Sequence, residues 1–178
     1  MAKTGLLVID MQVGLFAGEP CHDAEGVVSR INALARAVRD KGDTVILIQH
    51  ENEKTYAPGS RLWQFLPGLD RRPGDVTVGK RASDCFYRSD LESALRGRGI
   101  ERLIVTGCAT DFCVDTTIRS AASKDYDITV VADGHTTKDR PHLDAKTIIV
   151  HHNWMWSSLI LPERPVRVVS TEELLSNL

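Results

Sequence analysis

Short apolar runs rich in β-branched residues alternate with amphipathic stretches along most of the chain. Leu6-Leu7-Val8-Ile9 is a continuous apolar run between Gly5 and Asp10, which is typical of a strand buried on both faces. Similar runs recur and are also predicted strands; they cover 44–48, 75–78, 102–107, 128–132 and 166–169.

The segments between these strands carry apolar positions at helical spacing. In 26–40, valine, isoleucine and leucine side chains recur every three or four residues, which predicts an amphipathic helix. Ser89 and Glu92 stand in the relation of a capping box, so a helix is expected to begin there. Further helices are predicted over 111–124 and 144–156, with a closing one from 170.

Strands that alternate with helices predict right-handed βαβ crossovers. The expected fold is therefore α/β: three layers (α/β/α), with a six-stranded, mostly parallel sheet and helices on both faces. In such sheets the ligand lies beyond the carboxyl ends of the strands, where the strand order reverses. The proline- and glycine-rich connection 50–74 is long for a compact domain, which favours a functional role.

The composition and net charge limit which classes of binding partner are expected. The 178 residues are 42% hydrophobic and 26% charged, which favours one globular domain over 1–178. The net charge of −2 gives no reason to expect nucleic acid or a membrane as partner. No apolar stretch approaches the length of a membrane span, no signal-peptide cleavage region follows the N-terminus, and four cysteines do not suggest a disulfide framework. A cytoplasmic location is expected.

Three reactive residues lie at strand ends. Asp10 ends the first strand, Lys80 follows the third, and Cys113 begins the helix after the fourth. A parallel sheet brings all three to one edge. A helix start and a nearby ammonium lower the pKa of a thiol, and a carboxylate within reach can take its proton. Each residue alone has a plain structural interpretation, but their joint placement favours catalysis.

Three sequence blocks resemble the signatures of the isochorismatase-like cysteine hydrolases. They are Leu6–Gln12, Val78–Lys80 and Thr106–Thr117, the last with the pattern G-x-x-T-x-x-C-V-x-x-T. The resemblance implies a hydrolase of carbon–nitrogen bonds in a small amide or imide, which acts through a thioester. Cys113 would be the nucleophile, Asp10 the general base and acid, and Lys80 its charged partner.

The same resemblance implies a cis peptide bond between Cys108 and Ala109. The backbone N–H groups of Ala109 and Cys113 would then form an oxyanion hole. Members of the family form dimers or larger assemblies, so a homo-oligomer is expected. Trp154 and Trp156 lie in a segment interpreted as core plus subunit interface, and the adjacent His151 and His152 do not face the same way on a helix.

Metal and cofactor are expected to be absent. Metal-dependent nicotinamidases of the family carry Asp-x-His after the second strand, whereas here Gln49-His50 stands without that aspartate. Two alternatives stay open: vinyl-ether hydrolysis of the isochorismatase type, and a non-catalytic member that only binds a small molecule. Candidate pocket residues follow strand ends or lie in the long connection; they are Gln12, Phe16, His50, Trp63, Phe86 and Thr110.

Overall fold

In the computed structural model, which describes residues 2–178, six parallel strands form one sheet in the order β3-β2-β1-β4-β5-β6. The strands are β1 Lys3–Ile9, β2 Thr44–His50, β3 Val76–Lys80, β4 Ile100–Cys108, β5 Asp127–Thr136 and β6 Arg167–Val169. The predicted α/β fold is confirmed, and the strand order reverses between β1 and β4. Met1, the first residue of the predicted domain, lies outside the described residues.

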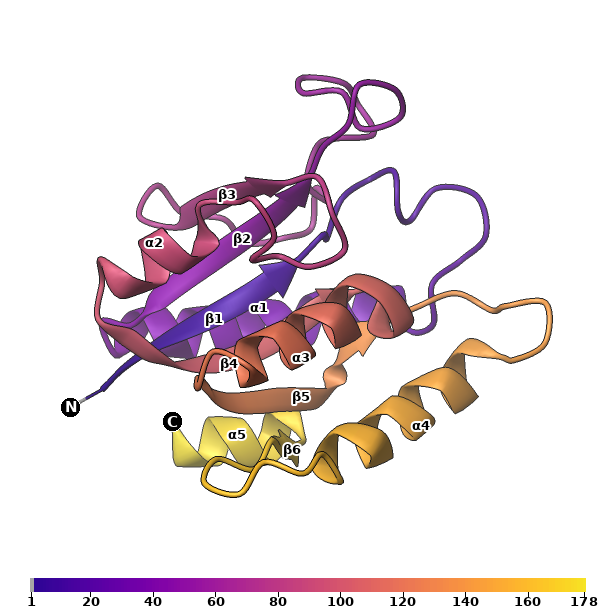
Figure 1. The fold of residues 1–178 in the computed structure, drawn as a ribbon. Helices are drawn as coiled ribbons and strands as arrows, with labels where there is room; N and C mark the ends of the chain where they lie inside the picture. Colours follow the sequence, from indigo (N-terminus) through magenta and orange to yellow (C-terminus); the bar gives the residue numbers. More distant parts are fainter. Residues whose placement is uncertain (1) are drawn as a thin grey trace.

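Helices cover both faces of the sheet (Figure 1). They are α1 Ala24–Asp40, α2 Leu91–Arg96, α3 Asp115–Ala122, α4 Ala145–Ser157 and α5 Thr171–Asn177, and a short π-helical turn, η1 Thr110–Val114, precedes α3. Apolar side chains of α1 and α5 pack on one face, and those of α2, α3 and α4 pack on the other. None of the helices within residues 2–178 has the length and apolar character needed to cross a bilayer.

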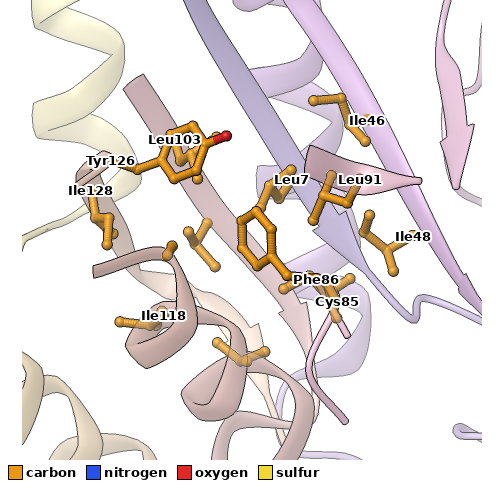
Figure 2. Packing of buried hydrophobic residues seen from close by; sticks show 14 of the residues in the cluster. Leu7, Ile46, Ile48, Cys85, Phe86, Leu91, Leu103, Ile118, Tyr126 and Ile128 are labelled. Atoms are coloured by element: carbon orange, nitrogen blue, oxygen red, sulfur yellow. The ribbon is translucent and has the colours of Figure 1, made fainter. Parts of the chain in front are cut away.

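Alternate side chains of the central strands enter the two cores. Leu7 and Ile9 of β1 pack on the side of α2 and α3, whereas Leu6 and Val8 pack on the side of α1. Both sets are fully buried, which explains why the strand reads as a continuous apolar run. Figure 2 shows the first of these cores, where Phe86 lies beside Leu7.

Several strand ends at the edge that carries the candidate site differ from the sequence prediction, and β2 continues to His50 and β4 to Cys108. Lys80 is the last residue of β3 and does not follow it. Strand β5 was expected to end at Ala132 but continues to Thr136, because its pairing with β4 shifts register and resumes with His135 opposite Gly107. A register irregularity of this kind leaves no signature in an apolar run.

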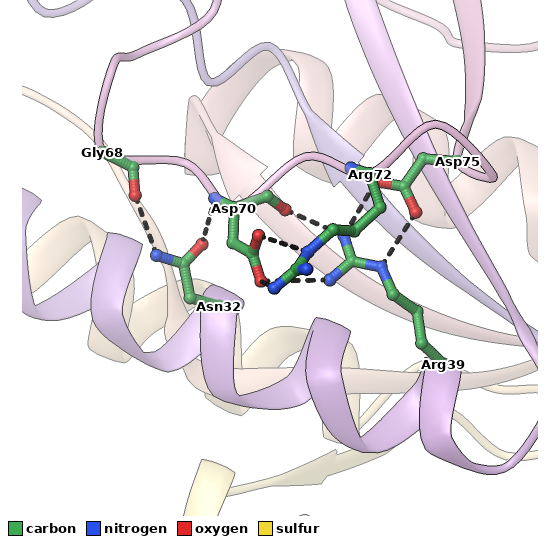
Figure 3. Close-up of polar contacts among 6 residues, drawn as sticks. All are labelled: Asn32, Arg39, Gly68, Asp70, Arg72 and Asp75. Atoms are coloured by element: carbon green, nitrogen blue, oxygen red, sulfur yellow. Dashed lines mark hydrogen bonds and ion pairs between the residues drawn. The ribbon is translucent and has the colours of Figure 1, made fainter.

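The long connection after β2 is tied down at two places. Its first part is held by Gln12, whose side-chain amide donates to the backbone oxygens of His50, at 2.9 Å, and Trp63, at 2.7 Å. Its later part lies on α1, where Arg39 donates to the carboxylates of Asp70, at 3.3 Å, and Asp75, at 2.7 and 2.9 Å (Figure 3). The first part of the connection is therefore held near the sheet edge, and the later part is held against α1.

The two tryptophans of helix α4, Trp154 and Trp156, lie in different environments. Trp156 is buried and donates its indole N–H to Asp115 at 2.8 Å, whereas Trp154 is 64% exposed. His152 makes its side-chain hydrogen bond with the backbone oxygen of Ile148. Trp156 therefore belongs to the core, and the subunit interface on this helix stays a prediction.

Candidate active site

The three reactive side chains singled out in the sequence meet at the carboxyl edge of the sheet. The Nζ atom of Lys80 lies 2.7 Å from Oδ2 of Asp10 and 3.2 Å from Sγ of Cys113. A third contact, 2.9 Å from Nζ to the carbonyl oxygen of Ala82, completes the surroundings of the ammonium. The parallel sheet thus gathers these groups from β1, β3 and η1, as expected.

Backbone geometry sets the directions of these side chains. Asp10 adopts a left-handed conformation with φ of 50° directly after β1, and its N–H donates to the carbonyl oxygen of Ile48. In η1 the N–H of Val114 donates to the carbonyl oxygen of Ala109, the wide spacing of a π-helical turn that carries Cys113. The peptide bond between Cys108 and Ala109 is cis, as expected.

Gly107 allows β4 to approach β1 closely beside the site. A Cβ atom at this position would lie 2.2 Å from the carbonyl oxygen of Ile9, and its φ of +120° is one that side-chain-bearing residues rarely adopt. A glycine is therefore required where β4 turns into the loop that leads to Cys113.

Burial has the largest single effect on the pKa values of Asp10 and Lys80. Asp10 is 1% and Lys80 2% exposed. Burial raises the pKa of Asp10, and the Lys80 ammonium opposes the rise without cancelling it. Burial alone would lower the pKa of Lys80, but the carboxylate of Asp10 and the neighbouring cysteines raise it above its ordinary value, so the ammonium is retained.

The Cys113 thiol is protonated at rest. Burial and then the carboxylate of Asp10 raise its pKa to about 12, which outweighs the opposing effect of Lys80. The sequence-based expectation of a lowered thiol pKa is therefore wrong for the free site, because desolvation exceeds the attraction of the ammonium. A thiol in this state needs a base for attack, and the Asp10 carboxylate is close enough to interact with it.

One oxygen of Asp10 is available as a proton acceptor. Both oxygens are buried and neither accepts a hydrogen bond of ordinary geometry among residues 2–178, but Oδ2 lies 2.7 Å from the Lys80 ammonium whereas Oδ1 has no ion-pair partner. A buried carboxylate oxygen without a donor is unusual in a folded protein. This arrangement suits an oxygen that receives a proton during a reaction.

A cavity of about 370 Å³ opens at the cluster. Asp10 and Cys113 line it together with residues at or after the carboxyl ends of β1, β2, β3, β4 and β5: Gly14, Leu15, Cys21, His50, Tyr56, Ser83, Cys108, Ala109, Phe112, Thr137, Lys138 and Arg140. The volume suits one small organic molecule.

Only one of the six predicted pocket residues, His50, lines this cavity. Gln12 is fully buried and uses its amide to hold the backbone after β2. Phe86 packs in the core, stacked on Tyr126 with ring centres 5.7 Å apart. Thr110 is also fully buried, and its hydroxyl is 2.9 Å from Nδ1 of His135.

The remaining two predicted pocket residues also lie outside the cavity. Phe16 packs against the core under α1, and Trp63 lies half-buried in the long connection, where its carbonyl oxygen accepts the bonds from Gln12 and Gln49. Position near a strand end does not fix which way a side chain points.

Sequence reasoning missed the residues after β5. Thr137, Lys138 and Arg140 line the cavity, but the strand before them was expected to end at Ala132, so the run 137–140 was not placed at the sheet edge. The same rule that selected Asp10 would have selected these residues had the true end of β5 been known.

His50 stands without other metal-ligand side chains. Within residues 2–178 no three His, Cys, Asp or Glu side chains are grouped as a metal site would require. Burial and the Lys80 ammonium lower the pKa of His50, so its imidazole is neutral. Burial likewise lowers the pKa of His135 to about 4, and this ring bridges η1 and α4.

The chain is similar in sequence to isochorismatase-type proteins. The family model "Isochorismatase domain" matches residues 4–151. An uncharacterized isochorismatase family protein, YecD of Escherichia coli O157:H7, is 32% identical over 192 residues, which cover 98% of this chain and 96% of the relative. The ureidoacrylate amidohydrolase RutB of Methylobacterium radiotolerans is 38% identical over 171 residues, which cover 74% of this chain and 66% of the relative.

Solved structures agree with the fold. The crystal structure of an isochorismatase family protein superposes with a TM-score of 0.87 at 30% identity, covering 94% of this chain and 98% of the other. An isochorismatase-like hydrolase from Alkaliphilus metalliredigens superposes with a TM-score of 0.84 at 25% identity, covering 99% of both chains.

Proposed function

Because this chain belongs to the isochorismatase family of hydrolases, we propose that it hydrolyses a carbon–nitrogen bond in a small amide or imide with Cys113 as nucleophile. The observation that carries the proposal is the contact chain from Asp10 through Lys80 to Cys113, at 2.7 and 3.2 Å, whose two ends, Asp10 and Cys113, line a cavity. The similarity to a ureidoacrylate amidohydrolase supports the same bond type.

In the first half-reaction a thioester forms. As Sγ of Cys113 attacks the carbonyl carbon, the thiol proton passes to Oδ1 of Asp10, and the carbonyl electron pair moves to its oxygen. The N–H groups of Ala109 and Cys113 are proposed to stabilise this oxyanion, since both residues line the cavity. The intermediate then expels the amine, which takes the proton from Asp10.

In the second half-reaction water releases the product. Asp10 takes a proton from a water molecule while the oxygen of that water attacks the thioester carbon. The new oxyanion collapses, the carbon–sulfur bond breaks, and the thiolate of Cys113 recovers the proton. The enzyme returns to its starting state and the substrate leaves as an acid and an amine.

Lys80 is proposed to act by charge and position. Its ammonium, held by Asp10 and the Ala82 carbonyl, lies beside the sulfur throughout and stabilises each transient thiolate. The same sulfur, which a vinyl-ether hydrolysis without a thioester would not use, favours carbon–nitrogen hydrolysis over that alternative.

The decisive experiment is to trap the acyl-enzyme. The protein is exposed to a panel of small amides, quenched in acid and digested, and the cysteine peptides are weighed by mass spectrometry. An acyl adduct is expected on Cys113, with Cys21, Cys85 and Cys108 in the same digest as internal controls. Turnover of any of these amides by a folded Cys113→Ala variant would contradict the proposal.

A further inference from the structure

Three cysteines lie on the cavity wall, and the proposed reaction uses one of them. Cys21, Cys108 and Cys113 all line the cavity as free thiols. Cys21 and Cys108 are 6% and 2% exposed and belong to the core on the side of α1. Two further sulfur atoms are therefore present at the site, and the proposed reaction gives them no chemical role.

The backbone brings Cys21 to the carboxyl end of β4. The N–H of His22 donates to the carbonyl oxygen of Thr137 at 2.9 Å, and the hydroxyl of Thr136 donates to the carbonyl oxygen of His22 at 2.5 Å. Thr136 lies opposite Cys108 in the pairing of β4 with β5. Cys21 directly precedes His22, so these bonds hold it beside Cys108.

The two thiols are in contact with each other. The Cys108 thiol donates a hydrogen bond to the sulfur of Cys21. The Cys21 sulfur is held from its other side by the carbonyl oxygen of Leu15, at 3.7 Å. The sulfur atoms of a disulfide lie about 2 Å apart, so two thiols already in hydrogen-bond contact need only a small approach to become bonded.

Cys21 is the more easily ionised thiol of the pair. The hydrogen bond from Cys108 lowers the pKa of Cys21 against the effect of burial, and the charges of Lys138 and Arg140 add to the lowering. The same hydrogen bond, together with burial, raises the pKa of Cys108 well above its ordinary value. A thiolate is the form that reacts with an oxidant, so Cys21 is the thiol expected to react first.

We propose that Cys21 and Cys108 are an oxidation site on the cavity wall, at which a hydroperoxide converts the two thiols into a disulfide. With hydrogen peroxide, the Cys21 sulfur attacks one oxygen, the O–O bond breaks, and a sulfenic acid forms on Cys21 while the other oxygen leaves as water with the thiol proton. The Cys108 sulfur then attacks the sulfenic sulfur. The S–S bond forms, the S–O bond breaks, and the hydroxyl group leaves as a second water with the proton of Cys108. Two electrons pass from the thiol pair to one peroxide.

The disulfide would act on the proposed reaction through the backbone of β4. Cys108 directly precedes Ala109, whose N–H is one of the two proposed oxyanion donors. A covalent bond to Cys21 ties this backbone to the loop after β1, and a donor must stay within about 0.5 Å of its productive position. The loss of turnover on oxidation therefore rests on the proposed function, whereas the disulfide rests on the thiol pair alone.

Peptide mapping of the peroxide-treated wild type tests the disulfide directly. The reduced protein is titrated with hydrogen peroxide at neutral pH, treated with catalase, blocked with N-ethylmaleimide, and digested with trypsin and Asp-N. Cleavage before Asp111 separates Cys108 from Cys113, which trypsin alone leaves in one peptide. We expect a linked pair of peptides that carry Cys21 and Cys108 and that dithiothreitol separates. The link should form at lower peroxide than any oxidation of Cys85, which is buried outside the cavity wall.

Two variants assign the step. Cys21→Ser removes one sulfur with little change in size and should leave Cys108 a free thiol under peroxide. Cys113→Ala is the matched control and should form the same link as the wild type. On an amide that the enzyme hydrolyses, peroxide should lower the wild-type kcat/KM at least about threefold, dithiothreitol should restore it, and Cys21→Ser should resist the loss.

Oxidation of Cys113 while Cys21 and Cys108 stay free would overturn the inference, as would a link between Cys108 and Cys113. Full turnover by the linked protein would overturn the effect assigned to the Ala109 donor. The mapping of the wild type needs no variant to fold. Because it also needs no turnover, an enzyme that forms no acyl adduct would refute the proposed reaction and leave the disulfide to be judged separately.

Discussion

Lys80 and Asp10 form an ion pair, 2.7 Å from Nζ to Oδ2, whose two side chains are almost wholly removed from water. Removing one partner of such a pair leaves the other charge buried without compensation, at a cost of about 3–5 kcal/mol. We expect Lys80→Met to lower the free energy of unfolding by about that amount, measured by urea denaturation at pH 7.

A double variant checks that the cost arises from the orphaned charge. Asp10→Asn combined with Lys80→Met removes both charges and should be more stable than Lys80→Met alone. If the double variant is as unstable as the sum of the two single variants, the two residues do not act as a pair.

Cys113 is the proposed nucleophile, and its removal tests the proposed reaction most directly. We expect Cys113→Ala to reduce kcat/KM by about 10³-fold or more on any amide that the wild type hydrolyses, because the proposed covalent intermediate forms on this sulfur. Since the Cys113 side chain is only partly buried, the variant should keep the wild-type midpoint in thermal unfolding. A variant that unfolds early would make the activity loss structural.

Gly107 offers a test of how the sheet shapes the site. In Gly107→Ala a Cβ atom would lie within 3 Å of three backbone atoms of Ile9, so the strands must separate. We expect a loss of about 2 kcal/mol or more in unfolding free energy. Gly74→Ala is the matched control, because nothing lies within 4 Å of an added Cβ there; an equal loss in both would contradict the close-approach argument.

The convergence of Asp10, Lys80 and Cys113 was predictable because each lies at or near the carboxyl end of a strand, and parallel strands share that edge. The residues that line the cavity could not be predicted in this way. Gln12 and Phe86 also lie near strand ends, but their side chains turn inward, one to bind backbone and one to pack on Tyr126. Such directions depend on tertiary packing that periodicity does not record.

The position of Lys138 at the site could not be predicted from the sequence either. Its place at the site follows from the register shift that carries β5 on to Thr136, and no apolar run marks that extension. The raised pKa of Cys113 could not be predicted from the sequence, because desolvation depends on how completely the folded chain surrounds the sulfur.

Activity is expected to be independent of metal. His50 lacks the aspartate that would precede it in an Asp-x-His site, and no cluster of metal-ligand side chains is present within residues 2–178. Prolonged dialysis against EDTA should leave kcat/KM unchanged, and added Zn²⁺ should not raise it. Loss of activity on chelation that Zn²⁺ restores would show this interpretation of His50 to be wrong.

The pH dependence of turnover follows from Asp10. Its pKa is raised by burial, and the carboxylate must be ionised to take the thiol proton. We therefore expect kcat/KM to fall as the pH drops through that raised pKa, at a pH above the range of an ordinary aspartate. On the alkaline side no comparable fall is expected near neutrality, since the pKa of Lys80 is raised.

Asp10→Asn should separate the reactivity of Cys113 as a thiol from its use in catalysis. The carboxylate raises the thiol pKa, so removing its charge leaves Lys80 beside the sulfur and increases the thiolate fraction at a given pH. We expect this variant to react faster than the wild type with iodoacetamide at pH 8 while its turnover falls by about 10²-fold or more, because the proton acceptor is gone. Slower alkylation together with the lost turnover would mean that Asp10 activates the resting sulfur, and that the proton transfer assigned to the moment of attack takes place before it.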